Sequence, residues 1–387
     1  MRAIREYYLY LGSVLNIVQR GQDGGLAVDD HAAADAFEEQ AAVRERAVDV
    51  DVVDLDEGPR CVVDVQERLV GREAEAVRHL VLVPADDELL VKVAATALNR
   101  ADLLQREGKY PPPPGESEIM GLEMAGTIIS CGKDVSAFEP GDRICGLLPG
   151  GGYAEKAIIP ANLAIPLLDS MSFTDGAAIP EVFLTAFQAL DWLANLQAGE
   201  RVLIHAGASG VGTAATQLAK RMGAGEIFVT ASAKKHEICR TLGANHCIDY
   251  RQENYSEVVL DKTDGKGVDV LIDFVGGPNF ANNLKSMNVD GRIVMLAFLG
   301  GPLTPEAVNL AAILRKRIHV MGSTLRSRSK AYKANLTNDL REKHWTAFAS
   351  GELRPIIDSE YSWTEVAAAQ TRMAENKNQG KIILTIP

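Results

Sequence analysis

Hydrophobic and polar positions change their spacing near residue 84 and again near residue 175. Between these points, short apolar runs such as ELLVKVAATALN (88–99), GTIISCG and DRICGLL are separated by glycine and proline, including PPPPG at 111–115. Short apolar runs with this punctuation are typical of β-strands joined by irregular loops. This part of the chain is therefore expected to form a mainly β, barrel-like unit.

A second pattern begins near residue 175. A helical period covers 174–195. Strand-like and helix-like segments then alternate in the order RVLIHA, TAATQLAKRMG, EIFVTAS, KKHEICRTLG, HCIDY, VDVLIDFV, RIVMLAF and RIHVMGS. Such alternation predicts a parallel sheet with helices on both faces. After about residue 330 the pattern is mixed, and it ends in strand-like GKIILTIP. The expected fold is thus α/β, with a doubly wound domain inserted into a β domain.

The first 83 residues differ in composition from the rest. No lysine occurs before residue 92, and residues 1–82 carry 17 acidic side chains against 9 arginines. Such a chain buries too little apolar surface to offset its conformational entropy. We expect a poorly ordered or locally helical extension, with a translated intron as the alternative. The segment lacks the basic start and apolar core of a signal peptide.

Bulk composition narrows the classes of function. The 387-residue chain is 47% hydrophobic and 24% charged, and its formal net charge is −12. Negative charge argues against nucleic acid or anionic membrane as a main partner. No apolar run reaches the ~18 residues that cross a bilayer. The five cysteines are odd in number and show no C-x2-C spacing, which favours reduced thiols in a cytoplasmic protein.

A cluster of small residues, GASGVG, joins the RVLIHA strand to the helix after it. Gly207, Gly210 and Gly212 permit a tight turn, close approach of a pyrophosphate and close packing of helix on strand. Backbone N–H groups and the helix N-terminus would then attract the phosphates. The cluster predicts a dinucleotide site, and a tight turn without a ligand is the alternative.

The end of the next strand selects the cofactor. NAD-binding proteins usually place an acidic residue there for the ribose 2′-hydroxyl. This chain instead offers Ser232, Lys234 and Lys235. A hydroxyl and ammonium groups would bind a 2′-phosphate, whereas a carboxylate would repel it. NADPH is therefore the expected cofactor.

Several motifs together resemble one family, the medium-chain dehydrogenase/reductase superfamily. The resemblance is carried by NRADLLQREGKYPPPPG, GLEMAGTI, PGDRICGLLPGGGYAE, AAIPEVFLTAFQAL, AGERVLIHAGASGVGTAATQLAK and ENKNQGKIIL. Within the superfamily they are most similar to the zinc-free, zeta-crystallin-like NADPH:quinone oxidoreductases of the tumour-suppressor-inducible subgroup. The resemblance implies a GroES-like catalytic domain over 84–180, an NADPH-binding Rossmann domain over 181–325 and a C-terminal return to the catalytic domain over 326–387.

The resemblance also implies a set of site residues. Tyr110 would face cofactor and quinone, since a phenol can donate to a quinone oxygen that gains negative charge. Packing on the polyproline run is its alternative role. Asn99 lies at the neighbouring polar position, with capping of the next helix as its alternative role. The residues expected at the cofactor are Ser209, Gly210, Val211 and Gly212 at the pyrophosphate, Ser232, Lys235 and Tyr250 at the 2′-phosphate end, Phe298 and Leu299 at the nicotinamide, and Asn378 over the cofactor.

Two departures from other members of the superfamily bear on function. Zinc-dependent relatives carry Gly-His-Glu where this chain has Gly121-Leu122-Glu123, and leucine cannot ligate zinc. No metal is therefore expected, and the chemistry would rest on the cofactor. The family also begins with a strand pair that completes the catalytic domain. MRAI resembles the opening of that pair, but residues 5–83 do not resemble the rest of it. The β-prone segments CVVDV (61–65) and HLVLV (79–83) could replace the pair.

The expected function is NADPH-dependent reduction of a quinone. One alternative is an enone or acrylate C=C reductase, because the same hydride geometry serves both. Another is a low-turnover NADPH-binding protein, crystallin-like or RNA-binding. Proteins of this family commonly pair through an edge strand of the cofactor domain, so a homodimer is expected near RIHVMGS (317–323).

Overall fold

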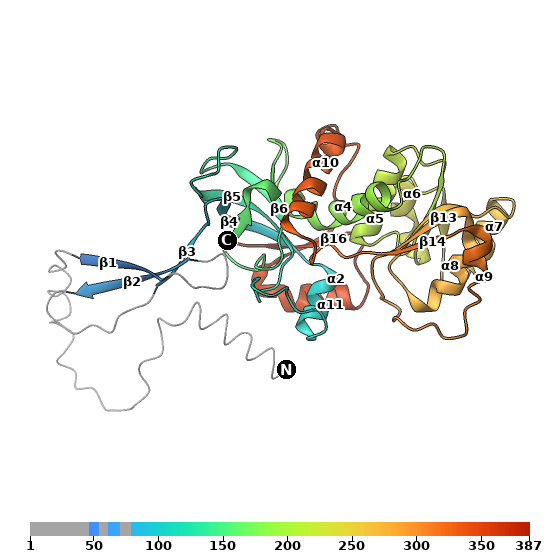
Figure 1. Cartoon of the computed structure of the whole chain (residues 1–387), viewed down its shortest axis with the longest axis horizontal. Helices are drawn as coiled ribbons and strands as arrows, with labels where there is room; N and C mark the ends of the chain where they lie inside the picture. Colours follow the sequence, from blue (N-terminus) through green and yellow to red (C-terminus); the bar gives the residue numbers. More distant parts are fainter. Residues whose placement is uncertain (1–45, 54–60, 70–78) are drawn as a thin grey trace, which may run out of the picture. The chain divides into compact units, whose positions relative to one another are not determined.

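The computed structural model describes residues 46–53, 61–69 and 79–387 (Figure 1). The predicted disorder or local helix of residues 1–83 falls largely outside these ranges. Both β-prone segments are strands: β2 (Cys61–Leu69) and β3 (His79–Val83) form a three-stranded sheet with β1 (Arg46–Val53), in the order β1-β2-β3. Residues 80–387 belong to the larger of two compact units.

A seven-stranded, mostly antiparallel sheet, here called the catalytic sheet, forms the part of that unit to which the resemblance assigns catalysis. Its strand order is β15-β16-β4-β5-β6-β8, and β7 pairs with β4. β4 is buried along almost its whole length, in keeping with its apolar sequence. The strands are β4 (Glu88–Ala97), β5 (Glu123–Cys131), β6 (Arg143–Leu147), β7 (Lys156–Pro160), β8 (Ala164–Pro166), β15 (Ile357–Ser362) and β16 (Lys381–Thr385).

A six-stranded parallel sheet forms the part that the resemblance assigns to the cofactor, in the order β11-β10-β9-β12-β13-β14. The chain leaves β9 first in one direction and then in the other, and ligands of such sheets commonly bind at the carboxyl ends of the strands at this point. The strands are β9 (Arg201–Ile204), β10 (Glu226–Thr230), β11 (His246–Ile248), β12 (Val268–Asp273), β13 (Met287–Met295) and β14 (His319–Gly322).

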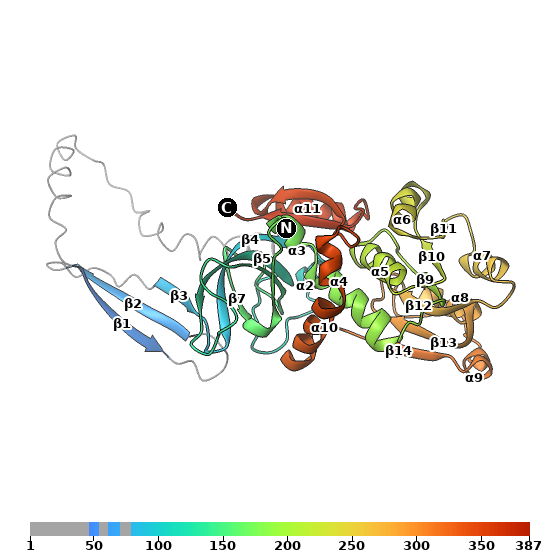
Figure 2. The same ribbon diagram turned by 90° about the horizontal axis from the view of Figure 1, so that it is seen from above.

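Helices pack on this parallel sheet, as the alternating pattern predicts (Figure 2). They are α5 (Gly210–Arg221), α6 (His236–Leu242), α7 (Tyr255–Lys262), α8 (Phe280–Ser286) and α9 (Ala311–Lys316). The predicted fold class, a Rossmann-type sheet with a mainly β GroES-like part, is confirmed. Among the described residues, no helix is long and apolar enough to cross a membrane.

The prediction of one continuous helix over 174–195 is wrong. The structure has α3 (Phe173–Ala177), then α4 (Pro180–Phe187), then a π-helical turn over Gln188–Leu193. Proline has no N–H for an intrahelical bond but is favoured in a first turn, so Pro180 ends one helix and begins the next. α4 and α10 (Lys330–Ala349) lie where the two sheets meet (Figures 1 and 2).

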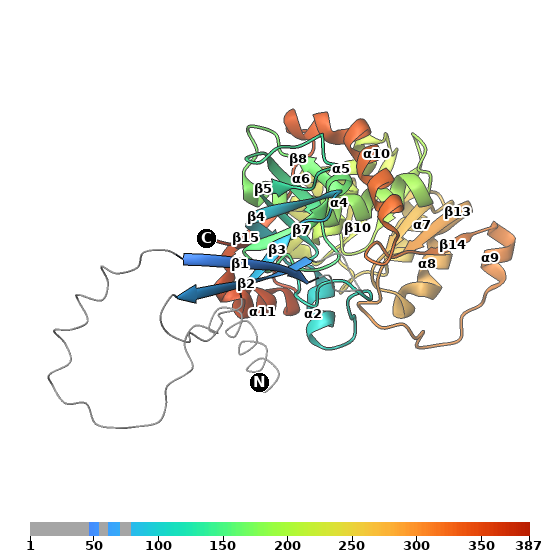
Figure 3. The ribbon, with the colours of Figure 1, turned by 60° about the vertical axis from the view of Figure 1, so that its left-hand side comes forward.

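Two short helices flank the other side of the catalytic sheet. α2 (Arg100–Arg106) and α11 (Val366–Ala374) lie side by side (Figures 1 and 3). Arg106 Nη1 donates to Gln370 Oε1 at 2.7 Å, which joins them across 264 positions of sequence. The segment between α11 and β16 is thereby brought to the start of α2.

Candidate active site

The glycine-rich loop forms the N-terminus of α5. Ser209 is the N-cap residue, and its hydroxyl oxygen accepts from Gly212 N–H at 3.0 Å. A Cβ at Gly207 would lie 2.6 Å from Val229 Cβ, and one at Gly212 would collide with the carbonyl of Ala206. Both positions therefore require glycine. The first N–H groups of a helix lack intrahelical acceptors and attract anions, so this loop fits a pyrophosphate.

The same loop is held against the C-terminal strand. Gly380 N–H donates to Ala208 O at 2.9 Å, and Ser209 pairs with Gly380 in a parallel bridge. A Cβ at Gly210 would lie 2.9 Å from Lys381 Cδ. Asn378, which is 8% exposed, donates from Nδ2 to Gly380 O at 2.8 Å. Asn378 therefore lies beside the phosphate loop and fixes the turn there.

Lys235 and Asn378, predicted at one cofactor, meet in the structure. Lys235 Nζ donates to Asn376 O at 2.9 Å and to Asn378 O at 2.6 Å. Ser232 is the N-cap residue of the short 3-10 turn Ala233–Lys235. Burial lowers the pKa of Lys235 from its usual value. The Lys235 ammonium thus joins the start of α6 to the Asn376–Asn378 segment.

The other predicted cofactor residues lie on open surface. Tyr250, just after β11, is 54% exposed, with the guanidinium of Arg251 5.7 Å from its ring centroid. Phe298 and Leu299 follow β13 and are each about half exposed. Phe298 packs against Gly276 beyond the end of β12. Such exposed apolar side chains at the carboxyl ends of the strands fit a nicotinamide ring.

A buried ion pair joins the catalytic sheet to the phosphate loop. Lys381 Nζ lies 2.7 Å from Glu123 Oε1, and the two side chains are 3% and 0% exposed. Lys381 also donates to Leu98 O at 2.9 Å and to Asn99 Oδ1 at 2.8 Å. Asn99 Nδ2 donates to Glu123 Oε1 at 2.8 Å. Because Lys381 also packs on Gly210, the polar cluster and the dinucleotide loop share one side chain.

Asn99 lies at the start of α2, and its amide belongs to the Lys381–Glu123 cluster. It occupies the N-cap position of α2, where its backbone N–H donates to Asp102 Oδ2 at 2.7 Å. Its amide group is bonded instead to Glu123 and Lys381. Asp102 Oδ2 also accepts from Tyr153 Oη at 3.0 Å, while Asp102 Oδ1 is buried without a partner. Burial, above all other causes, raises the pKa of Asp102 to about 6.

Tyr110 lies in the loop after α2, next to an arginine from the far end of the chain. Arg326 Cζ is 5.3 Å from the centroid of the Tyr110 ring, and Arg326 Nη1 donates to Tyr110 O at 3.4 Å. Burial and the nearby Glu181 raise the pKa of the Tyr110 phenol. The phenol is therefore a proton carrier at neutral pH and can donate a hydrogen bond.

Sequence reasoning missed several residues of this cluster. Glu123 and Lys381 lie inside the quoted motifs, and a charged residue within an apolar strand is the signal that could have identified them. Glu181 follows Pro180 in the first turn of α4, and its N–H donates to Glu123 Oε2 at 2.8 Å. Arg326 carries no sequence signal, since only the fold brings it to Tyr110.

The Glu181 carboxyl gives a prediction about pH. Burial first, and Glu123 second, raise its pKa to about 8. A raised folded-state pKa gives a stabilising contribution that is present below about pH 4.5 and is lost as pH rises through about 8. We expect the free energy of unfolding of the wild-type protein to fall by about 1–3 kcal/mol more than that of Glu181→Gln between pH 5 and pH 8. Urea unfolding at four pH values measures this, and parallel profiles would contradict it.

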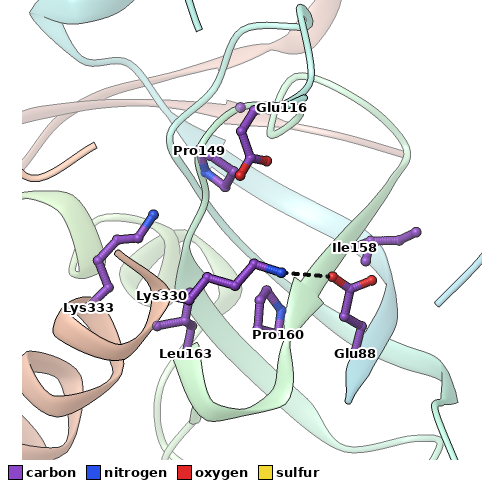
Figure 4. A pocket seen from close by; sticks show the side chains of 9 residues that line it. Glu88, Glu116, Pro149, Ile158, Pro160, Leu163, Lys330 and Lys333 are labelled. Atoms are coloured by element: carbon purple, nitrogen blue, oxygen red, sulfur yellow. Dashed lines mark ion pairs between the residues drawn. The ribbon is translucent and has the colours of Figure 1, made fainter. Parts of the chain in front are cut away.

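A polar cavity is lined in part by Pro149, whose carbonyl oxygen accepts from Arg326 Nε. Glu88 and Glu116 face Lys330 and Lys333 there (Figure 4). Lys330 Nζ lies 3.7 Å from Glu88 Oε1, and Lys333 Nζ donates to Arg326 O at 3.5 Å.

Among the described residues, no group of three or more His, Cys, Asp or Glu is placed to hold a metal ion. Leu122, at the zinc-ligand position of relatives, is 2% exposed.

Comparisons with known proteins identify the family to which this fold belongs. The model of the alcohol dehydrogenase GroES-like domain matches residues 85–169, and that of zinc-binding dehydrogenases matches 210–339. The chain is 32% identical over 314 residues to the synaptic vesicle membrane protein VAT-1 homolog of Homo sapiens, covering 78% of this chain and 79% of the relative.

Two further matches carry enzyme names. The chain is 31% identical over 323 residues to a quinone oxidoreductase of Rattus norvegicus, covering 82% of this chain and 95% of that protein. The crystal structure of the CurK enoyl reductase superposes with a TM-score of 0.70 at 28% identity, covering 88% of this chain and 99% of that one. Together with the fold and the glycine loop, these matches show that the chain belongs to the medium-chain dehydrogenase/reductase superfamily, whose members are oxidoreductases that bind a nicotinamide cofactor.

Proposed function

We propose that this protein is an NADPH-dependent oxidoreductase that passes hydride to a quinone-type acceptor. The observation that carries the proposal is the position of Lys381. Its ammonium lies within the Asn99–Glu123 cluster, and its stem packs on Gly210 of the phosphate loop. A polar cluster and a dinucleotide cradle are thus adjacent, as hydride transfer between two bound molecules requires.

When bound, the cofactor would supply the hydride, and the protein would supply position and electrostatics. The Ser209 loop and the N-terminus of α5 would hold the pyrophosphate. Phe298 and Leu299 would keep water from one face of the nicotinamide. The Tyr110 phenol would donate to the acceptor oxygen, and Glu181, neutral below about pH 8, holds a proton in the same cluster.

The preference for NADPH rests on the end of β10. Residues 231–236 contain no acidic side chain, and Lys235 lies there with its ammonium group beside Asn378. A carboxylate would accept a hydrogen bond from the ribose 2′-hydroxyl of NADH, whereas an ammonium group would bind the 2′-phosphate of NADPH. Ser232 and Tyr250 would complete this end of the site.

A C=C reductase of enones or acrylates is the second candidate, favoured by the structural likeness to an enoyl reductase. A low-turnover NADPH-binding protein is the third. Steady-state oxidation of NADPH and of NADH with 1,2-naphthoquinone and with a simple enone separates the three. Quinone turnover that exceeds enone turnover and favours NADPH is expected. Binding of NADPH without turnover of either acceptor would overturn the proposal.

Metal removal should leave the activity intact. Leu122 cannot ligate zinc, and the chemistry proposed here needs no Lewis acid. We expect turnover to be unchanged after prolonged dialysis against EDTA, with well under one zinc per chain by elemental analysis. Stoichiometric zinc whose removal abolishes turnover would contradict this expectation.

We also propose a homodimer through the edge of the parallel sheet. β14 is the edge strand, and apolar side chains on it and on α9 are open: Val320 is 39% exposed and Leu314 82%. Pairing two β14 edges would cover both strands and this surface. Light scattering at micromolar concentration is expected to report twice the 41.7 kDa chain mass. A monomer across that range would refute the dimer.

A further inference from the structure

We infer that the Arg326 guanidinium is a catalytic group that stabilises the negative charge developing on the acceptor oxygen during reduction. The inference rests on the proposed hydride transfer and adds a residue to it. The role differs from that of Tyr110, which donates a neutral hydrogen bond. Arg326 would supply a full positive charge that is fixed before the acceptor arrives.

The first observation is an unused donor. Arg326 is 6% exposed. Its Nε donates to Pro149 O at 2.7 Å, and its Nη1 donates to Tyr110 O at 3.4 Å. Nη2 is buried and has no hydrogen-bond partner. A buried guanidinium N–H without an acceptor is costly, and such groups are rare in native proteins, so each calls for an explanation such as a catalytic role.

The second observation is the missing counter-ion. No carboxylate oxygen of the described residues lies within 4.0 Å of this guanidinium. Burial lowers the pKa of Arg326, whereas Tyr110, Asp102, Glu181 and Glu116 raise it by acting on the guanidinium from farther away. No carboxylate of the described residues therefore pairs directly with Arg326. A bound group that becomes negative would gain most from it.

The third observation is that Arg326 is fixed in place. It lies on the segment between β14 and α10, next to Leu325, which is 5% exposed. Lys333 Nζ donates to the Arg326 carbonyl at 3.5 Å. The guanidinium plane is also held over the ring of Tyr110, 5.3 Å from its centroid. A charge held this firmly need not reorganise during the reaction, which makes it effective in the transition state.

Atoms and electrons balance in this step. The cofactor would supply a hydride: a C–H bond of the donor would break, and a C–H bond would form at the acceptor carbon that is conjugated to the carbonyl. The C=C π pair of the acceptor would shift toward the carbonyl carbon, and the C=O π pair would move onto oxygen, which becomes negative. Nη2–H of Arg326 would donate to this enolate oxygen. A proton from water, which leaves hydroxide, would then neutralise the enolate. A quinone would reach its hydroquinone by tautomerisation, and an enone its saturated ketone.

Three variants test this role in the full chain. Arg326→Gln removes the charge, Arg326→Lys keeps it, and Arg354→Gln removes an exposed arginine elsewhere. We expect Arg326→Gln to lower kcat about 100-fold, the usual effect of losing one oxyanion donor. Arg326→Lys should recover about tenfold of that loss, and Arg354→Gln should behave as wild type. NADPH affinity and melting temperature should change little. Equal kcat values for wild type and Arg326→Gln would overturn the inference.

A binding measurement separates this inference from the proposed function. 4-Nitrophenol serves as the probe, because its anion mimics the oxyanion and absorbs in the visible. The wild-type protein should lower the pKa of the bound phenol by about one unit or more, whereas Arg326→Gln should not. Absence of quinone and enone turnover together with this shift would sink the proposed function but support the role of Arg326. An equal shift in both proteins, or no binding to the wild type, would overturn the role.

Discussion

Lys381→Met is expected to lower the free energy of unfolding by about 3–5 kcal/mol, the usual effect of removing one partner from a buried ion pair. Methionine reproduces the stem of lysine but cannot donate to Leu98 O, Asn99 Oδ1 or Glu123 Oε1. The Glu123 carboxylate would keep the Asn99 amide and the Glu181 N–H but would lose its only cation within 4 Å among the described residues. Urea unfolding at pH 7 measures the change.

Two comparisons make this test specific. Lys377→Met removes the ammonium of an exposed pair with Glu375, whose side chains are 61% and 49% exposed, so its effect should stay within about 0.5 kcal/mol. Adding Glu123→Gln to Lys381→Met should recover part of the lost stability, because no uncompensated charge then remains. If Lys381→Met costs no more than Lys377→Met, the ion pair does not stabilise the fold.

Lys235→Ala should raise the KM for NADPH about 10- to 150-fold, as expected for loss of a charge-assisted contact of about 1.5–3 kcal/mol. The KM for NADH should change less than threefold, since NADH has no 2′-phosphate. Lys234→Ala is the matched control, because Lys234 is the exposed neighbour of Lys235. Initial rates with each cofactor give both constants. An equal loss with NADPH and NADH would assign Lys235 to the Asn376–Asn378 loop instead of to the phosphate.

Much of the fold can be predicted because it follows from local periods. The alternation that begins at RVLIHA gives β9, α5 and β10, since each element buries one face at its own spacing. The continuous helix predicted over 174–195 is interrupted at Pro180, where a new helix begins although the apolar pattern continues. The apolar residues of this segment are buried as predicted.

The candidate site was predictable only in part, for a related reason. The phosphate loop is a local motif, so Ser209 and the three glycines could be placed from sequence. Arg326 and Tyr110 are 216 positions apart, and they meet only because the chain returns to the catalytic part after completing the parallel sheet. Glu181 resembles any acidic residue in a first helical turn, and only burial beside Glu123 sets it apart.

The position of β16 inside the catalytic sheet has a consequence for synthesis on the ribosome. β16 lies between β15 and β4, and Lys381 bonds Leu98, which is made 283 residues earlier. Residues 95–97 of β4, which pair with β16, must therefore remain without that partner while the whole parallel sheet is translated. Such an unpaired apolar edge is a site for chaperones or for aggregation. Glu123 is made 258 residues before Lys381, so the polar cluster around this ion pair is among the last parts of the molecule to form.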